Sequence, residues 1–132
     1  MTLTHINPAG LHRNPAFSQG VLVTGGQLLV VGGQHGTDES GQLVSTELGE
    51  QMKQALRNVL AVLAEVGADA SHVAKLSIYL AAGADAGAGY ASAFEVWGAN
   101  PTAVTVLTVP SFARPGVLVE IEALASVPER AS

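Results

Sequence analysis

Apolar residues recur every three or four positions in one long stretch of the chain, residues 48–66. Its apolar positions are Leu48, Met52, Ala55, Leu56, Val59, Leu60, Leu63 and Val66. Charged and amide side chains fall largely on the other side, which is the pattern of an amphipathic helix that buries one face. Ser45 or Thr46 is the expected N-cap of this helix, and Gly67 is its expected stop.

Five short runs of mostly apolar residues predict strands. They are Val21–Thr24, Gln27–Val31, Lys75–Leu80, Ala103–Val109 and Val117–Leu124. The first two flank a Gly-Gly pair, residues 25–26, and predict a tight hairpin. The last two flank a loop rich in Pro and Gly, which predicts a second hairpin-type connection. Residues 1–18 contain several breakers and are expected to be irregular.

A second helix is expected from about Asp85. Glycines weaken helices in this region, but aromatic and small residues still recur at helical spacing. These are Tyr90, Ala93, Phe94 and Trp97, and Asn100-Pro101 ends the pattern. The order β-β-α-β-α-β-β predicts an α+β fold in a single domain, residues 1–132, with two helices on one face of one sheet.

The predicted strands are apolar on both faces. Residues 28–31 form a continuous apolar run, and residues 103–107 are interrupted only by Thr105. A sheet with one wet face should alternate apolar and polar residues instead. Two helices cover one face only, so we expect other copies of the chain to cover the second face.

The amino-acid composition disfavours nucleic acids and membranes as binding partners. Hydrophobic residues make up 48% and charged residues 13%, and six Lys and Arg leave a net charge of −5. Without a basic stripe we expect no nucleic-acid partner and no membrane binding. Residues 1–15 show no secretory pattern, the longest apolar run is too short to span a bilayer, and cysteine is absent. A cytoplasmic protein is therefore expected.

Two acids in the last predicted strand are the most informative polar residues. Glu120 and Glu122 stand two positions apart and therefore point to the same face of the strand. They are either an ordinary solvated face or, beside a subunit interface, the carboxylates of a cleft. The four histidines show no ligand spacing, so no metal site is expected. His35, in the Gly-rich loop, is either a ligand contact or a solvated loop residue, and the second interpretation is preferred.

Four segments of the chain resemble, in order, signature segments of Rid (RidA/YjgF) proteins. They are Phe17-Ser18-Gln19, Val30-Val31-Gly32-Gly33-Gln34, the helical pattern Gln51-x-x-Gln54-Ala55-x-x-Asn58, and Leu118-Val119-Glu120-Ile121-Glu122-Ala123. The resemblance implies a chorismate-mutase-like α+β fold with one mixed sheet, and a homotrimer with three clefts between subunits. It also implies hydrolysis of reactive enamines and imines to keto acids and ammonia, without a cofactor.

The active members that the chain resembles place an arginine at the start of the penultimate strand, where its guanidinium holds the substrate carboxylate. That position falls on Val104, and no Arg or Lys occurs between Lys75 and Arg114. The chain is therefore identified as a member of an Arg-lacking subgroup. Phe17 and Tyr90 also stand where active members of the family carry other residues.

The residues that keep the family pattern are Ser18, the backbone of Gly32-Gly33, and Glu120, which matches the site carboxylate. A hairpin centred near residue 112 would place Val104 opposite Glu120, so we expect these two to be neighbours. The expected ligand-binding residues are Phe17, Ser18, Gly32, Gly33, Tyr90, Val104 and Arg114.

Three hypotheses about function follow. The first is a hydrolase or deaminase acting on a small neutral or cationic imine, in which Glu120 positions water. The second is a non-catalytic trimer that holds a small metabolite or regulates a partner. The third is that Arg114 replaces the lost anchor, which requires its loop to fold back or a neighbouring subunit to present it.

Overall fold

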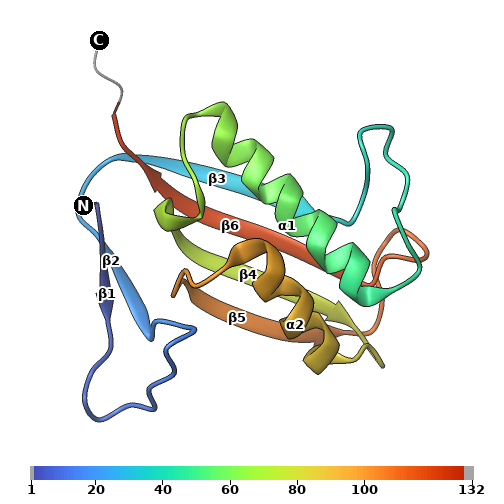
Figure 1. Ribbon diagram of the computed structural model, residues 1–132, viewed down its shortest axis with the longest axis horizontal. Helices are drawn as coiled ribbons and strands as arrows, with labels where there is room; N and C mark the ends of the chain where they lie inside the picture. The colour runs from blue at the N-terminus through green and yellow to red at the C-terminus, as the bar shows by residue number, and fades with distance from the viewer. Residues whose placement is uncertain (1, 130–132) are drawn as a thin grey trace.

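The computed structural model describes residues 2–129, which form six strands, two α-helices and one 3₁₀ turn (Figure 1). In chain order the elements are β1 (Leu3–Ile6), β2 (Gly20–Val23), β3 (Gln27–Gln34), α1 (Leu48–Glu65), the 3₁₀ turn (Ala70–His72), β4 (Val73–Ala81), α2 (Ala86–Trp97), β5 (Ala103–Val109) and β6 (Val119–Val127).

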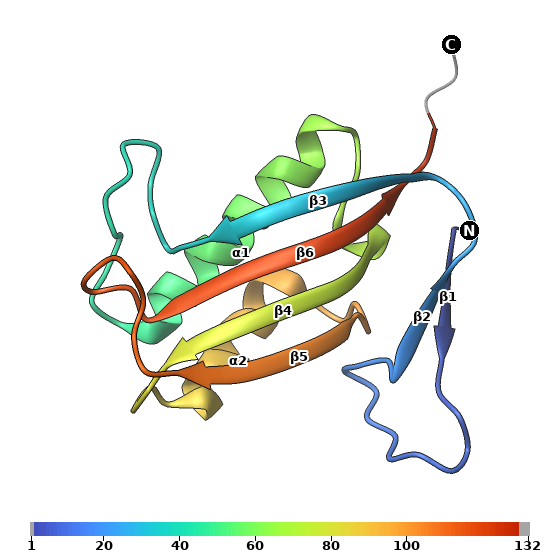
Figure 2. The same cartoon turned by 180° about the vertical axis from the view of Figure 1, so that it is seen from behind.

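Four of the strands form one mixed sheet in the order β3-β6-β4-β5. β6 runs antiparallel to both β3 and β4, whereas β4 and β5 are parallel. Both helices pack on the same face of this sheet, and the other face is open, as the view from behind shows (Figure 2). The predicted α+β class, the mixed sheet and the placement of both helices on one face are confirmed.

The first predicted hairpin is wrong. β2 pairs with β1, in the register Leu3↔Val23, and the two form a separate ribbon. β3 pairs with β6 instead. The turn at Gly25-Gly26 is real, since Gly26 has a φ of 84°. It directs the chain from one sheet into the other. β1 lies in the segment that was expected to be irregular, and without it β2 has no obvious partner other than β3.

The second predicted hairpin is also wrong, because β4 lies between β6 and β5. The connection from β4 to β5 contains α2, and a crossover through a helix returns the chain parallel to the strand it left. In the observed register Val104 pairs with Leu76 on β4, whereas Glu120 pairs with Tyr79. Val104 and Glu120 are therefore not neighbours, contrary to the expectation.

The helix ends follow the predictions in part. Gly67, with a φ of 73°, follows the end of α1, and Asp85 caps α2 by accepting hydrogen bonds from the backbone of Gly87 and Ala88. The N-cap of α1, however, is Glu47, whose side chain makes no capping bond. The Ser45 hydroxyl oxygen instead accepts from the Glu47 N–H, because Ser45 lies two residues before the N-cap position.

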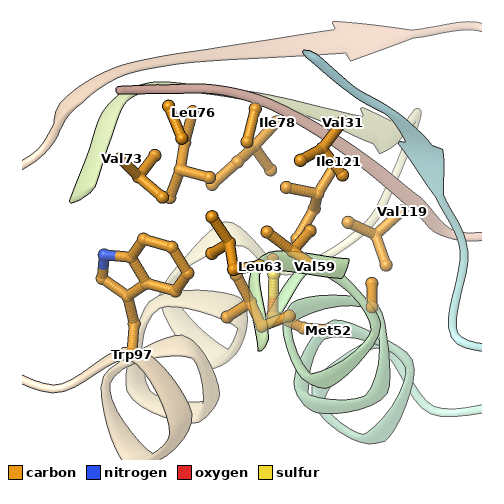
Figure 3. Packing of buried hydrophobic residues seen from close by; sticks show 14 of the residues in the cluster. Val31, Met52, Val59, Leu63, Val73, Leu76, Ile78, Trp97, Val119 and Ile121 are labelled. Atoms are coloured by element: carbon orange, nitrogen blue, oxygen red, sulfur yellow. The ribbon is translucent and has the colours of Figure 1, made fainter. Parts of the chain in front are cut away.

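A single cluster of buried side chains fills the space between the helices and the sheet (Figure 3). On β6 the alternate residues Val119, Ile121 and Ala123 point into this cluster, toward α1. The residues between them, Glu120 and Glu122, therefore face the open side of the sheet. This alternation fixes which face the two acids occupy.

The open face of the sheet carries several exposed apolar side chains in a single subunit. Leu28 and Val30 on β3 are 73% and 64% exposed, and Leu107 and Leu124 are also exposed. On β3 the residues that alternate with Leu28 and Val30, namely Leu29 and Val31, pack against the core on the helix side. The prediction of apolar residues on both faces is thus confirmed for β3. β4, by contrast, presents Lys75, Ser77 and Tyr79 to the open face, and the trimer remains a prediction. Within residues 2–129 no helix is both long and apolar enough to cross a membrane.

Candidate functional site

Glu120 is held by a histidine at one end of the sheet. The Nε2 atom of His35 lies 2.5 Å from Oε1 of Glu120, and the two side chains are only 25% and 34% exposed. His35 follows β3 directly, and Glu120 is the second residue of β6, which pairs with β3. The interpretation of His35 as a solvated loop residue is therefore wrong: its ring is half-buried and bonded to the acid.

Two further groups hold His35 in place. The side-chain amide of Asn58, on α1, donates to the backbone carbonyl oxygens of His35 and Thr37, each over 3.0 Å. The ring of Phe112 meets the His35 ring edge to face, with centroids 6.2 Å apart. The imidazole is thus fixed from the helix on one side and from the loop between β5 and β6 on the other.

A glycine leaves room for the Glu120 carboxylate. The pairing of β3 with β6 shifts register between Val31 and Gln34, so Gly32 and Gly33 form a bulge. A Cβ atom on Gly33 would lie 2.8 Å from Cδ of Glu120, closer than real Cβ contacts allow. A Cβ atom on Gly32 would meet nothing within 4 Å. Gly33 is therefore the glycine that the position of Glu120 requires.

The second acid of the pair has a different partner. The hydroxyl of Tyr79, on β4, donates to Oε1 of Glu122 over 2.6 Å. This hydrogen bond, with a smaller contribution from burial, raises the pKa of Tyr79 above its ordinary value. Glu120 and Glu122 share one face, as predicted, but each has its own partner. Glu122 is held by a phenol, whereas Glu120 is held by an imidazole.

The loop that contains Arg114 folds back toward Glu120. Gln51, fully buried on α1, donates to the carbonyl oxygens of Ser45 and Gly116 and accepts from the N–H of Leu118, all over 2.9 Å. These bonds tie the loop to α1, and Phe112 carries it to the His35 ring. Arg114 is half-buried in this loop and forms no salt bridge with any residue in the described part of the chain.

Three of the expected ligand-binding residues lie elsewhere, on the helix side of the sheet. Phe17, Tyr90 and Val104 all line an apolar pocket between α2 and the strands β4 and β5. The rings of Phe17 and Tyr90 meet edge to face, with centroids 6.0 Å apart. Val104 is two strands away from Glu120 and about 10 Å further along the strand direction. Within one subunit these residues do not join Glu120.

Ser18 has a connecting role in the fold. It is buried, and its hydroxyl donates to the carbonyl oxygen of Pro101, just before β5. Nδ1 of His5 lies 2.7 Å from the same hydroxyl oxygen. Ser18 thus ties the ribbon of β1 and β2 to the start of β5. It lies about five residues, or roughly 16 Å, along β5 from Leu107, the residue level with Glu120.

The sequence alone did not single out His35, Asn58, Phe112 or Gln51 for the roles that they play in this cluster. One signal was available for the first of these: a histidine directly after a Gly-Gly-Gln at the end of a strand. No group of three or more His, Asp or Glu side chains among residues 2–129 could hold a metal ion.

The four-stranded mixed sheet, with both helices on one face and a bulge beneath a carboxylate, defines a small α+β protein of the chorismate-mutase-like class. The model of the family described as Endoribonuclease L-PSP matches residues 11–127. The chain therefore belongs to this family, which is that of the Rid (RidA/YjgF) proteins, and the resemblance found in the sequence is confirmed.

Individual relatives agree with this assignment. The chain is 42% identical over 66 residues to the human 2-iminobutanoate/2-iminopropanoate deaminase, a match covering 49% of this chain and 47% of that protein. It is 37% identical over 65 residues to a RutC family protein of Pyrococcus abyssi, covering 48% and 50%. The matched part of the chain thus spans about half the length of these curated relatives.

Solved structures extend the likeness to nearly the whole chain. A Rid-family protein of unknown function from Yersinia pestis, YyfB, has a TM-score of 0.86 and is 30% identical, over 96% of this chain and all of that one. A member of the YjgF/YER057c/UK114 family from Mycobacterium tuberculosis has a TM-score of 0.67 at 27% identity, over 84% and 86%.

Proposed function

We propose that the chain forms a homotrimer through the open face of its sheet and hydrolyses a small imine or enamine in a cleft between subunits. The observation that carries the proposal is the His35–Glu120 pair, a half-buried carboxylate positioned by an imidazole over a glycine bulge. Relatives over half the chain are named 2-iminobutanoate/2-iminopropanoate deaminases. No cofactor is needed for this chemistry.

The chemistry needs a base that holds one water molecule. Water adds across the C=N bond, so that oxygen bonds to carbon and a proton reaches nitrogen. The resulting carbinolamine then loses ammonia and leaves a carbonyl. In the proposed role Glu120 accepts the proton from water and returns it to the departing nitrogen. His35 occupies Oε1, which leaves Oε2, above Gly33, to face the water.

The separation of the site residues supports a cleft that two subunits share. Glu120, His35 and Gly33 lie at one end of the sheet, whereas Phe17 and Tyr90 lie on its helix side. No small ligand could touch both groups in one subunit. Apolar residues left exposed on the open face favour association of copies there. In the proposed trimer the Glu120 cluster of one subunit faces the Phe17–Tyr90 pocket of the next.

The charges near Glu120 favour a substrate without a carboxylate. No Arg or Lys occurs between Lys75 and Arg114, and the pocket around Val104 is apolar. Losing a charged hydrogen-bonding partner typically costs about 1.5–3 kcal/mol per bond. We therefore propose a small neutral or cationic imine as substrate. Arg114 remains a second candidate anchor, because its loop folds back onto the His35 ring.

A non-catalytic trimer that binds a small metabolite is the alternative. It is favoured by the apolar side chain at position 104, where the active members that the chain resembles carry the arginine anchor. A role on RNA, which the family description suggests, is disfavoured by the net charge of −5 and the thin spread of six Lys and Arg. Measured turnover of an imine distinguishes the hydrolase from the non-catalytic binding protein.

The test measures ammonia and carbonyl release from imines generated in situ by an amine oxidase. We expect the protein to accelerate hydrolysis of neutral imines and Glu120→Gln to remove most of the effect. Glu122→Gln, the same change two residues along the strand, is the matched control and should keep it. Ligand binding without any acceleration, for imines of several sizes, would establish the alternative.

A further inference from the structure

A cavity of about 100 Å³ lies between α2 and the strands β4 and β5. It is bounded by the β1–β2 connection as well as by the helix and the sheet. Residues that line it include Phe17, Met52, Ile78, Tyr90, Trp97 and Val104. It opens on the helix side of the sheet, so it is separate from the Glu120 cluster of its own subunit.

Small residues of α2 leave space between its aromatic side chains and the sheet. Ala86, Gly89 and Ala93 line the cavity from the helix, where larger side chains would fill the space. Phe94, on the same helix, also lines the cavity and is 62% exposed. The chain therefore leaves aromatic surface beside an open space, instead of packing it into the core, and such surface gains free energy when an apolar group covers it.

The walls present rings and hydrocarbon to the interior. The indole of Trp97 directs its N–H away, to the hydroxyl oxygen of Thr102 over 3.3 Å. Figure 3 shows the indole beside the buried cluster, below Val73 and Leu76. Phe17 meets Tyr90 edge to face and closes one side from the β1–β2 connection. None of the lining residues is charged, so a charged ligand would lose its hydration without compensation.

We propose that this cavity binds a small uncharged apolar molecule, or the apolar end of a larger one, about the size of one six-membered ring. An apolar cavity of roughly 150 Å³ binds benzene in a well-studied case. The present cavity is somewhat smaller but open on one side, so part of the ligand would project. This inference does not rest on imine hydrolysis. Should that hydrolysis occur, the cavity would select substrates with an apolar substituent.

Trp97 makes the proposal directly measurable, because it is the only tryptophan in the chain. Bromobenzene is a suitable probe, since its heavy atom quenches indole fluorescence on contact. We expect saturable quenching with a Kd on the order of 0.1–1 mM. Ala93→Leu, which fills the cavity from the helix, should weaken binding at least about tenfold. Ala91→Leu, the same change on the exposed side of α2, is the matched control and should bind as the unaltered protein does.

A second variant that fills the cavity keeps the test decisive if Ala93→Leu does not fold. Val104→Phe reduces the cavity from the sheet side and should weaken binding to a similar degree, with circular dichroism confirming that each variant is folded. Glu120→Gln should leave the quenching curve unchanged, because an uncharged probe makes no use of a carboxylate, and binding can then be scored apart from turnover. Quenching that stays linear in bromobenzene, or saturable quenching that both filling variants retain, would overturn the proposal.

Discussion

Nε2 of His35 lies 2.5 Å from Oε1 of Glu120, although the two residues are 85 positions apart in the chain. The contact joins the end of β3 to the start of β6 and fixes one carboxylate oxygen. The sequence showed no partner for Glu120, and this contact gives its carboxylate a defined orientation.

Replacing His35 should lower turnover more than it weakens substrate binding. His35→Leu removes the group that orients Glu120, and a small misplacement of a catalytic group can cost about 100-fold in rate. We expect kcat for a neutral imine to fall about 10- to 100-fold, with KM changing little, because Glu120 transfers protons during the reaction and does not hold the substrate in the ground state. His35→Gln retains a donor and should keep more of the rate. Equal kcat values in all three proteins would show that the pair has no catalytic role.

Adding one methyl group at Gly33 should displace Glu120 without unfolding the protein. The new Cβ would clash with a flexible side chain, so Glu120 can rotate away at a cost of about 1 kcal/mol. The His35 ring resonances of Gly33→Ala, followed by NMR, should then resemble those of Glu120→Gln. Gly32→Ala, whose Cβ meets nothing, is the structural control. Unchanged His35 resonances in Gly33→Ala would mean that the carboxylate does not lie over this glycine.

The sequence pattern predicted which face of a strand each side chain occupies better than it predicted which strands pair. Period-two alternation placed Glu120 and Glu122 together on the face opposite Ile121, as observed. Pairing failed twice, because a run of apolar residues does not show which strand lies beside it. The insertion of β6 between β3 and β4 depends on contacts far apart in the chain, and α2 as a crossover was the clue that β5 runs parallel to β4.

The candidate site was predictable in its carboxylate and its glycines, but not in its supporting residues. Asn58 was recognised only as part of a helical pattern, and its bonds to the carbonyls of His35 and Thr37 follow from how α1 crosses the end of β3. Phe17, Tyr90 and Val104, three of the expected ligand-binding residues, line one pocket together. Their separation from Glu120 followed from the strand order that the sequence did not reveal.

Charging the open face should dissociate the proposed trimer. Leu28 and Val30 are the most exposed apolar residues of that face, and two lysines there would have to be desolvated in an interface. We expect light scattering to give about three times 13.4 kDa for the unaltered protein and about 13.4 kDa for Leu28→Lys/Val30→Lys. Ala61→Lys/Ala64→Lys, on the exposed side of α1 and away from the Phe17–Tyr90 pocket, should leave the mass unchanged. A monomer mass for the unaltered protein would refute the trimer.

Tyr79 should titrate above an ordinary tyrosine as long as Glu122 is ionised beside it. Its pKa is raised chiefly by the hydrogen bond to that carboxylate. The neutral phenol therefore stabilises the fold fully below about pH 10, and this contribution is lost as the pH rises through the folded-state pKa. Ultraviolet titration, assigned with Tyr79→Phe, should show the pKa of Tyr79 falling in Glu122→Gln. No change in that variant would mean that the pair does not form in solution.

Gln51 should be among the most sensitive polar residues of the chain. Gln51→Leu removes three hydrogen bonds and leaves buried backbone groups of the 110–118 loop unpaired, which should cost about 2–4 kcal/mol of unfolding free energy. Gln54→Leu is the matched control on the same helix. Its single bond to Asn58 is half-buried, so we expect a cost below about 1 kcal/mol. Similar unfolding free energies for the two variants, measured in urea, would contradict this role.

Substitutions at Val104 and at Arg114 test in different ways whether the protein acts on imines that carry a carboxylate. Val104 lines an apolar cavity away from Glu120 of its own subunit. Val104→Arg should therefore bury a guanidinium without a partner and destabilise the fold by about 3–5 kcal/mol, without raising activity on imines of alanine-like amino acids.

Arg114 is the only cation that the sequence offers in the loop beside His35. If the reaction is confined to neutral imines, these should react at least about tenfold faster than carboxylate-bearing ones. Arg114→Gln should then leave the neutral rate unchanged. The assay compares keto-acid and aldehyde release from imines generated in situ by amino-acid and amine oxidases. Comparable rates on both classes, with loss of the carboxylate class alone in Arg114→Gln, would instead identify Arg114 as the anchor and make an anionic substrate the correct assignment. Loss of both classes in that variant would point to disruption of the 110–118 loop, which the Gln51→Leu protein would reproduce.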